Sequence, residues 1–388
     1  MKHQGFLSTS DKPHYENEPF EVPSSWVWTT LGEIFTLQAG KNITAKDIYT
    51  EKSEEYKYPC FGGNGIRGYV AISNKIGEYP IIGRQGALCG NINLAHGSFY
   101  ATEHAVVVER YCDTDLMWGY YTLIALNLNQ YATATAQPGL AVNVINNVAI
   151  PLPPLHEQQR ISKSIKILFS FLDAIECEKL YLKTAISQTK TKVLDLAIHG
   201  RLVPQDPTDE PASELLKRIN PNAEITSDNG HYQKLPEGWC ETTLKHVLTI
   251  KSGNSINVRN CTQGHYPIYG GNGITGHTDD YNIKESTIVI GRVGYYCGSV
   301  YLVRGKAWVS DNAFITTIHK DIFYKKYLYY LLQFLNLRKF SNSTAQPVIS
   351  GKTIYPIHVL IPPIREQKSI VAKIEEIFAP LNAIEASL

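Results

Sequence analysis

A long internal repeat constrains the fold of this chain more than any other sequence feature. Residues 59–66 return as residues 267–274, 208 positions later, and the Gly-Arg-x-Gly stretch at Gly83 returns at Gly291 with the same separation. The Ala-Gln-Pro segment that begins at Ala136 returns after 209 positions. Because almost no insertions separate the copies, we expect two similar domains related by a pseudo-two-fold. Such a chain is suited to engage one two-fold target or two related targets.

The composition is that of a globular protein. Apolar residues make up 43% and charged residues 19% of the 388 positions, enough for two or three domains with their own cores. No apolar run reaches about 18 residues, so no membrane span is expected, and residues 1–20 lack a signal peptide's apolar stretch. Seven cysteines without a Cys-x-x-Cys motif, with Cys89 and Cys297 at equivalent positions, favour buried reduced thiols over a disulfide or metal framework. We therefore expect a cytoplasmic protein without a metal site.

The charge is distributed unevenly between the copies. Residues 236–361 contain 13 Lys and Arg against 7 Asp and Glu, whereas residues 1–154 contain 10 against 14. This difference is compatible with ordinary surface variation or with a polyanion near the second copy. The whole chain has a net charge of only +1, so charge alone does not indicate nucleic-acid binding.

Each copy reads as a mainly β domain that ends in helices. Short runs of Tyr, Val, Ile and Thr alternate with Gly and Asn, the pattern of strands joined by tight turns. Helical stretches are predicted at residues 116–130 and 322–339. After Pro153-Pro154 the spacing of the apolar residues changes. From Ile161 to Leu196 successive seam residues are separated alternately by four and three positions. That heptad seam predicts a long coiled-coil helix.

The second copy repeats the heptad seam after Pro362-Pro363, from Ile370 to Leu388. We therefore expect an α+β fold, with two mainly β domains arranged pseudo-two-fold and separated by an antiparallel coiled coil. The predicted segments are a β domain at 1–152, a central helix at 153–200, a linker with a short helix at 201–235, a second β domain at 236–361 and a short distal helix at 362–388.

No segment carries the pattern of a catalytic centre. Residues 61–65 fit the Phe-x-Gly-x-Gly loop of adenosylmethionine-dependent methyltransferases, but no Asn/Asp-Pro-Pro-aromatic motif accompanies them, and a tight turn is favoured. Residues 350–353 resemble the end of a phosphate-binding loop, but Gln346 occupies a required glycine position. Glu55 and Lys57 lack the partners of a nuclease site. These observations favour a non-catalytic binding subunit, with a stand-alone adenine methyltransferase as the alternative.

Two features resemble the specificity subunit of Type I restriction–modification systems. One is the Pro-Pro-x-x-Glu-Gln helix after each β domain, and the other is the run from Ala197 to Leu216, typical of that family's central conserved region. The resemblance implies two target-recognition domains, each reading half of a bipartite, asymmetric double-stranded DNA site. It implies no cofactor and no activity for this chain alone. Two partner modification subunits would use S-adenosylmethionine to methylate adenine, and restriction subunits would use ATP and Mg²⁺ to translocate and cut DNA, in a bacterial or archaeal cytoplasm.

Comparison of the copies predicts the DNA-contacting residues. Positions that are equal should form scaffold or phosphate contacts, and positions that differ within equal surroundings should carry sequence information. Arg84 and Arg292 are equal, so they are predicted as phosphate clamps or shared guanine readers, with buried structural arginines as the alternative. For the differing positions the alternative is surface variation. The predicted residues are Asn64, Arg67, Tyr69, Arg84, Gln85, Asn91 and His104 in the first copy, and Asn272, Thr275, His277, Arg292 and Asn312 in the second.

The coiled coil predicts a partner surface. An antiparallel pairing with the shorter distal helix should leave part of the central seam uncovered, at Leu182, Ile186, Val193 and Leu196 or at its opposite end. An exposed apolar seam marks an interaction site, so we expect it to bind a helix of the modification subunit. The distal helix would span about 37 Å, close to one DNA turn of about 34 Å. Half-site centres are therefore expected about one turn apart.

Overall fold

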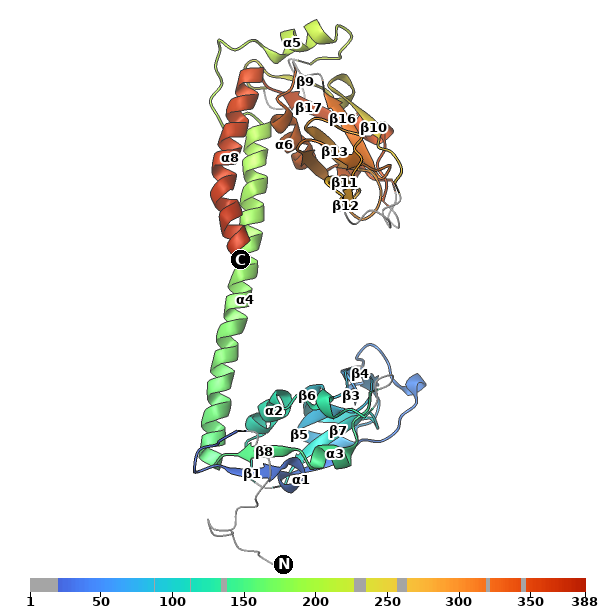
Figure 1. Ribbon diagram of the computed structural model, residues 1–388, viewed down its shortest axis with the longest axis vertical. Helices are drawn as coiled ribbons and strands as arrows, with labels where there is room; N and C mark the ends of the chain where they lie inside the picture. Colours follow the sequence, from blue (N-terminus) through green and yellow to red (C-terminus); the bar gives the residue numbers. More distant parts are fainter. Residues whose placement is uncertain are drawn as a thin grey trace, which may run out of the picture. The chain divides into compact units, whose positions relative to one another are not determined.

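The computed structural model describes residues 20–86, 88–111, 113–133, 138–226, 235–256, 264–318, 322–342 and 347–388 (Figure 1). The chain divides into two compact units, Met1–Ile175 and Glu176–Leu388, which we call unit 1 and unit 2. The division falls inside one long helix, α4 (Leu155–Ile198). No helix among the described residues combines the length and the apolar character needed to cross a bilayer.

Unit 1 is built on a six-stranded sheet with the order β2-β7-β5-β6-β3-β4, beside a two-stranded sheet of β1 and β8. Its strands are β1 (Val27–Thr30), β2 (Phe35–Ala39), β3 (Tyr58–Gly62), β4 (Gly65–Val70), β5 (Lys75–Gly83), β6 (Ile92–Ala101), β7 (Ala105–Arg110) and β8 (Ala149–Leu152). Its helices before α4 are α1 (Leu31–Ile34), η1 (Ala45–Asp47), α2 (Leu116–Ala125), η2 (Leu128–Tyr131) and α3 (Val142–Asn146).

The core of unit 1 lies between this sheet and α2. Val106 and Val108 of strand β7 are buried in one cluster with Trp118 and Leu123 of α2. Val107, on the opposite face of the strand, is buried in a second cluster with Ile81 and Phe99. Helix α2 begins where the Asp115 carboxylate accepts a 2.8 Å hydrogen bond from the backbone N–H of Trp118, a typical N-cap. A helix begins at Leu116 as predicted, but α2 ends at Ala125, and the rest of the predicted stretch to residue 130 contains the short helix η2.

Unit 2 repeats the order of the main elements of unit 1 and has an additional helix, α5, before its first strand. Its strands are β9 (Cys240–Thr243), β10 (Leu248–Ser252), β11 (Tyr266–Gly270), β12 (Gly273–Thr278), β13 (Thr287–Gly291), β14 (Val300–Val303), β15 (Trp308–Val309), β16 (Ala313–Ile318) and β17 (His358–Ile361). Its helices are α5 (Ala212–Ile219), η3 (Leu244–His246), α6 (Lys325–Leu335), η5 (Leu337–Phe340), α7 (Gly351–Ile354) and α8 (Ile364–Ser387).

One difference separates the two sheets. Strand β6 of unit 1 runs for ten residues, whereas its counterpart in unit 2 is broken into β14 and β15. The sheet of unit 2 therefore divides into β10-β16-β13-β14 and β12-β11-β15. The parallel pairing of β3 with β6 nevertheless recurs as β11 with β15, so the strand neighbours are preserved. The equivalent glycines Gly97 and Gly305 both have a positive φ, so the glycine conformation is common to both units.

Helix α8 packs antiparallel against the C-terminal part of α4 within unit 2 (Figure 1). Lys190 of α4 forms a 2.5 Å ion pair with Glu385 near the end of α8. At the other end Ile370 and Ile374 of α8 are fully buried in the same cluster as Ile198. The heptad seam therefore predicted both helices correctly, and their antiparallel pairing in unit 2 is confirmed.

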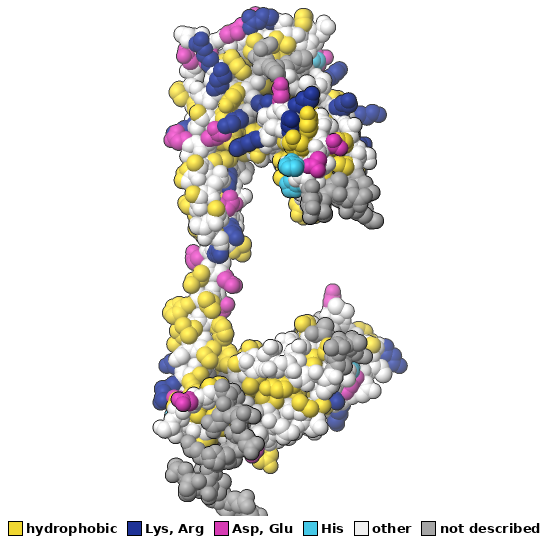
Figure 2. Space-filling view, in the orientation of Figure 1, with side chains coloured by type: hydrophobic (Ala, Val, Ile, Leu, Met, Phe, Trp, Pro, Cys, Tyr) yellow, Lys and Arg dark blue, Asp and Glu magenta, His cyan; other side chains and the backbone are white. Residues whose placement is uncertain are grey.

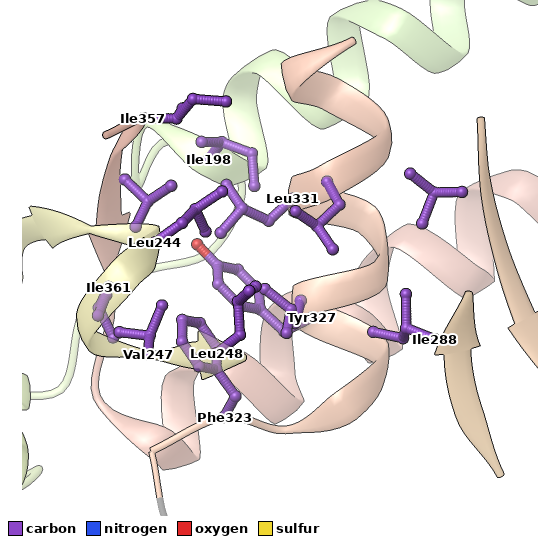
Figure 3. Close-up of a cluster of buried hydrophobic side chains, with 14 of the residues drawn as sticks. Ile198, Leu244, Val247, Leu248, Ile288, Phe323, Tyr327, Leu331, Ile357 and Ile361 are labelled. Atoms are coloured by element: carbon purple, nitrogen blue, oxygen red, sulfur yellow. The ribbon is translucent and has the colours of Figure 1, made fainter. Parts of the chain in front are cut away.

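The core of unit 2 joins the helices to the β domain. Figure 3 shows Ile198 of α4 beside Leu331 of α6, with Leu244 and Ile357 close by. In the same unit, the buried Glu366 carboxylate accepts hydrogen bonds from the Trp239 indole at 2.9 Å and from the Gln205 amide at 3.1 Å. Burial raises the pKa of Glu366, and these two donors partly offset that effect.

Of the two places expected for the uncovered seam, the structure contradicts the one at Ile186 and Val193 and supports the opposite end of the helix. Ile186 is only 3% exposed and Val193 only 8%, because this stretch packs inside unit 2 next to the Lys190 contact with α8. Leu196 is half-buried, and Leu182 is 39% exposed. The exposed apolar side chains of α4 lie earlier in the helix, where Figure 2 shows hydrophobic side chains gathered. They are Ile167, Leu168, Phe169, Phe171, Leu172, Ile175, Leu180 and Tyr181.

Candidate nucleic-acid interface

Three loops of unit 1 meet at the ends of the sheet strands. They are the β3–β4 turn at residues 63–64, the β5–β6 loop at 84–91 and the β6–β7 turn at 102–104. The backbone N–H of Arg84 donates to the His104 carbonyl at 2.8 Å, and that of Gly83 donates to the Asn91 carbonyl at 2.8 Å. The N–H of Gly86 donates to the Pro138 carbonyl at 3.0 Å. We call this hydrogen-bonded arrangement the loop frame.

Unit 2 contains the same loop frame. The N–H of Arg292 donates to the Asn312 carbonyl at 2.9 Å, and that of Gly291 donates to the Ser299 carbonyl at 2.8 Å. The N–H of Gly294 donates to the Pro347 carbonyl at 2.9 Å. Because each bond has its counterpart at nearly the same length, the two units present side chains from closely similar backbones.

Glycines allow the loops to approach one another. A Cβ added to Gly83 would overlap the carbonyl oxygen of Gly63, and a Cβ added to Gly63 would crowd the carbonyl oxygen of Gln85. The pair Gly291 and Gly271 shows the same crowding in unit 2. The repeated Gly-Gly-Asn-Gly motif is therefore explained by close backbone contact.

We expect Gly83→Ala to disturb the loop frame of unit 1 strongly. The added methyl meets backbone rather than a flexible side chain, so the strands must separate, at a cost of about 1–3 kcal/mol. Thermal unfolding and target binding should both be impaired. Gly139→Ala is the matched control, because its Cβ would meet only the Arg84 carbonyl at 3.9 Å. Equal melting temperatures for the two variants would contradict the close contact.

A hollow of about 470 Å³ lies within the loop frame of unit 1. Four of the predicted DNA-contacting residues line it: Asn64, Arg67, Gln85 and His104. Asn91 lies at its margin, since its side-chain amide donates to the Asn64 side chain at 3.4 Å. The structure therefore brings together residues that are far apart in the sequence. Tyr69, farther along β4, is not part of the lining.

The repeated arginines brace the loops. The Nε of Arg84 donates to the Leu140 carbonyl at 3.1 Å. In unit 2 the guanidinium of Arg292 donates to the Ser252 hydroxyl and to the Asp311 carbonyl, each at 3.3 Å, and lies over the Phe314 ring. These contacts support the structural interpretation of both arginines. Contact of either arginine with DNA stays a prediction.

Three buried polar atoms, in His104 and in residues close to the lining, have no hydrogen-bond partner among the described residues. Nε2 of His104 lies 3.2 Å from the Glu103 carboxylate. The other ring nitrogen of His104, one oxygen of Glu103 and the amide nitrogen of Asn93 are buried without a hydrogen bond within the described part of the chain. The sequence comparison missed Asn93, although its counterpart in the second copy is Tyr301, a difference of the kind that it sought.

The thiol of Cys60, on β3, is buried and poorly suited to act as a nucleophile. Burial raises the pKa of the Cys60 thiol to about 11, an effect that Arg67 partly offsets and Glu103 reinforces. Cys89 and Cys297 are also buried and free, as the sequence predicted.

Phe61 is buried against Phe99 at a ring distance of 5.6 Å, so the methyltransferase-like motif is a tight turn on a packed strand. Within the described ranges no cluster of His, Cys, Asp and Glu could hold a metal ion.

The loop frame of unit 2 carries different side chains from the loop frame of unit 1. Thr275, Val293 and Asn312 stand where unit 1 has Arg67, Gln85 and His104, and Asn272 keeps the place of Asn64. The Thr275 hydroxyl donates to the Ile268 carbonyl at 3.3 Å. His277, on β12, is exposed. Each predicted residue of unit 2 is thus at least partly accessible.

An exposed tyrosine pair in unit 2 was missed by the sequence comparison. Tyr295 and Tyr296 are 67% and 48% exposed, and the guanidinium of Arg338 lies 4.3 Å from the ring centre of Tyr295. The corresponding residues of the first copy are Ala87 and Leu88. Exposed aromatic rings beside a cation are suited to contact a nucleic acid.

Comparison with known proteins identifies relatives across both copies. The profile of the family described as "Type I restriction modification DNA specificity domain" matches residues 23–188 and 236–388. The specificity subunit of the Type I restriction enzyme EcoprrI from Escherichia coli is 43% identical over 167 residues, which cover 43% of this chain and 41% of that subunit. The EcoAI specificity subunit from the same species is 22% identical over 484 residues, covering 95% of this chain and 80% of that subunit.

Solved structures share the fold. A chain from a study of complex assembly and conformational transition of the type I R-M system has a TM-score of 0.63 at 17% identity, covering 95% of this chain and 94% of its own. The HsdS subunit from Thermoanaerobacter tengcongensis has a TM-score of 0.51 at 16% identity, with coverage of 95% and 93%. These matches confirm the predicted α+β class. The family and its relatives do not support the stand-alone methyltransferase that was kept as the alternative.

Proposed function

Because the chain belongs to the Type I restriction modification DNA specificity domain family, we propose that it is the sequence-recognition subunit of a Type I restriction–modification complex. Each unit reads one half of a bipartite, asymmetric double-stranded DNA target. The observation that carries this proposal is the loop frame, which occurs twice with equal backbone bonds and different side chains. A repeated scaffold with altered side chains is what two related but unequal half-sites require.

The chain contributes recognition, and its partners contribute chemistry. Two modification subunits bind S-adenosylmethionine and methylate adenine, and restriction subunits use ATP and Mg²⁺ to translocate and cut DNA. The chain itself binds none of these cofactors and is not catalytic. The relatives named as specificity subunits support this division of roles. The complex acts in the cytoplasm of a bacterium or archaeon.

The exposed stretch of α4 is the docking surface for the modification subunit. From Ile167 to Leu182 its large apolar side chains are between 39% and 71% exposed. Surfaces of this kind are rarely left in contact with water unless they bind a partner. This stretch replaces Ile186, Val193 and Leu196 as the proposed contact.

Titration of the purified chain with S-adenosylmethionine tests the division of roles. We expect no saturable heat in isothermal titration calorimetry with the chain alone, and specific methylation of duplex DNA only after the modification subunit is added. A duplex library sequenced after methylation would report the target. Saturable micromolar binding by the chain alone would instead indicate an enzyme.

A further inference from the structure

The inference concerns which base pair each loop frame reads, and it rests on the proposed DNA recognition. The two loop frames have equivalent backbone hydrogen bonds, so equivalent side chains project from equivalent positions on the two backbones. Arg67 and Gln85 in unit 1 correspond to Thr275 and Val293 in unit 2. The first pair offers long donors, whereas the second offers methyl groups and one short hydroxyl.

The polar side chains of unit 1 are available to a ligand. Both Arg67 and Gln85 are exposed and line the hollow. Neither side chain forms a hydrogen bond or an ion pair with any residue in the ranges that the structure describes. By contrast, Arg84 is occupied by its contact with the Leu140 carbonyl. Arg67 is therefore the arginine of this loop frame that is free to read a base.

The charges around the hollow favour a base edge over a phosphate. The Glu103 carboxylate lies 3.2 Å from Nε2 of His104, a residue that lines the hollow. A phosphate would meet repulsion from Glu103, whereas a neutral base edge would not. A guanidinium flanked by amides matches the acceptors that a purine presents in the major groove.

Unit 2 lacks this chemistry at the same place. The Thr275 hydroxyl already donates its proton to the Ile268 carbonyl, and Val293 has no polar atom in its side chain. Apolar side chains of this size meet the thymine methyl group, and amides such as those of Asn272 and Asn312 pair with adenine. The surface therefore suits an A·T pair and offers no bidentate donor for guanine.

We propose that Arg67 reads a guanine in the half-site of unit 1, with Gln85 contacting the neighbouring base, and that the equivalent position in the half-site of unit 2 is an A·T pair read through Thr275 and Val293. The two half-sites thus differ in base composition because the loop frames of the two units share a backbone arrangement but carry different side chains.

The methylated motif of variants in complex with the modification subunit tests this assignment. Arg67→Ala should relax one position of one half-site, with discrimination for guanine falling about 5- to 150-fold while the other half-site is unchanged. The reciprocal Thr275→Arg should introduce a guanine preference at the matched position of the other half-site. Lys52→Ala is the control, because this exposed cation of unit 1 does not line the hollow and its loss should leave the motif unchanged. Melting curves of the variants distinguish lost recognition from lost folding.

Each contrary result has its own meaning. A motif that is unchanged in Arg67→Ala while all sites weaken equally would make Arg67 a phosphate contact and overturn the assignment. A Thr275→Arg variant that folds but keeps the original motif would overturn the equivalence of the two frames. A wild-type complex that methylates no defined motif would overturn the proposed function itself, and this result is separate from the other two.

Discussion

Replacing Ile186 and Val193 with glutamate is expected to unfold unit 2. Both side chains are buried, at 3% and 8% exposure, and Val193 belongs to the core cluster that contains Ile198 and Ile370. Loss of their packing costs about 1–4 kcal/mol per site, and burial of an unpaired carboxylate adds a desolvation cost. The combined loss should exceed about 4 kcal/mol, a large share of the stability of a typical domain.

Thermal unfolding followed by circular dichroism, together with limited proteolysis, measures this effect. The matched control is Gln188→Glu with Thr191→Glu, two exposed positions of the same part of α4. The control should melt close to wild type, since exposed substitutions usually change stability by less than about 0.5 kcal/mol. Wild-type melting of the Ile186 and Val193 variant would show that this stretch is not packed in unit 2.

Replacing Leu172 and Ile175 with glutamate is expected to abolish co-purification with the modification subunit while both units stay folded. These seam positions are 54% and 62% exposed, so the charges remain solvated in the free chain. In the complex the same charges would be buried in an apolar contact, where an unpaired carboxylate is strongly unfavourable. Affinity purification of the modification subunit through the tagged chain provides the measurement.

The control for this experiment lies outside the exposed apolar stretch of the same helix. Gln188→Glu with Thr191→Glu adds the same charge at two exposed positions after Leu182. It should keep wild-type co-purification. If the Leu172 and Ile175 variant also retains the modification subunit, that subunit docks elsewhere on the chain.

Local patterns were sufficient to predict most of the fold. The repeat predicted two similar domains because equal sequences favour equal strands and turns, and the heptad spacing predicted α4 and α8 because a helix shows its buried face at a fixed period. The same period could not show which part of the seam is covered. Ile175 and Ile186 are equally good heptad residues, but only Ile186 is buried within the chain.

The candidate site was predictable in part for a similar reason. Comparison of the copies selected Arg67, Gln85 and His104, which the structure brings around one hollow. It could not distinguish Arg84, which the Leu140 carbonyl holds, from Arg67, which is free. That distinction depends on a hydrogen bond between two residues that are 56 positions apart in the sequence, and a local sequence pattern cannot predict such a contact. The exposed Tyr295 and Tyr296 differ from Ala87 and Leu88 at the equivalent positions, so the comparison of the copies could have selected them but did not.

The DNA sequence motif that the complex methylates tests the central claim most directly. The chain and its modification subunit are expressed in a host without adenine methylation, and the modified positions are found by single-molecule sequencing of the host DNA. The account predicts two different short blocks of specified bases, separated by an unspecified spacer, with block centres about one helical turn apart. A continuous motif, or a palindrome whose halves are inverted repeats, would contradict it.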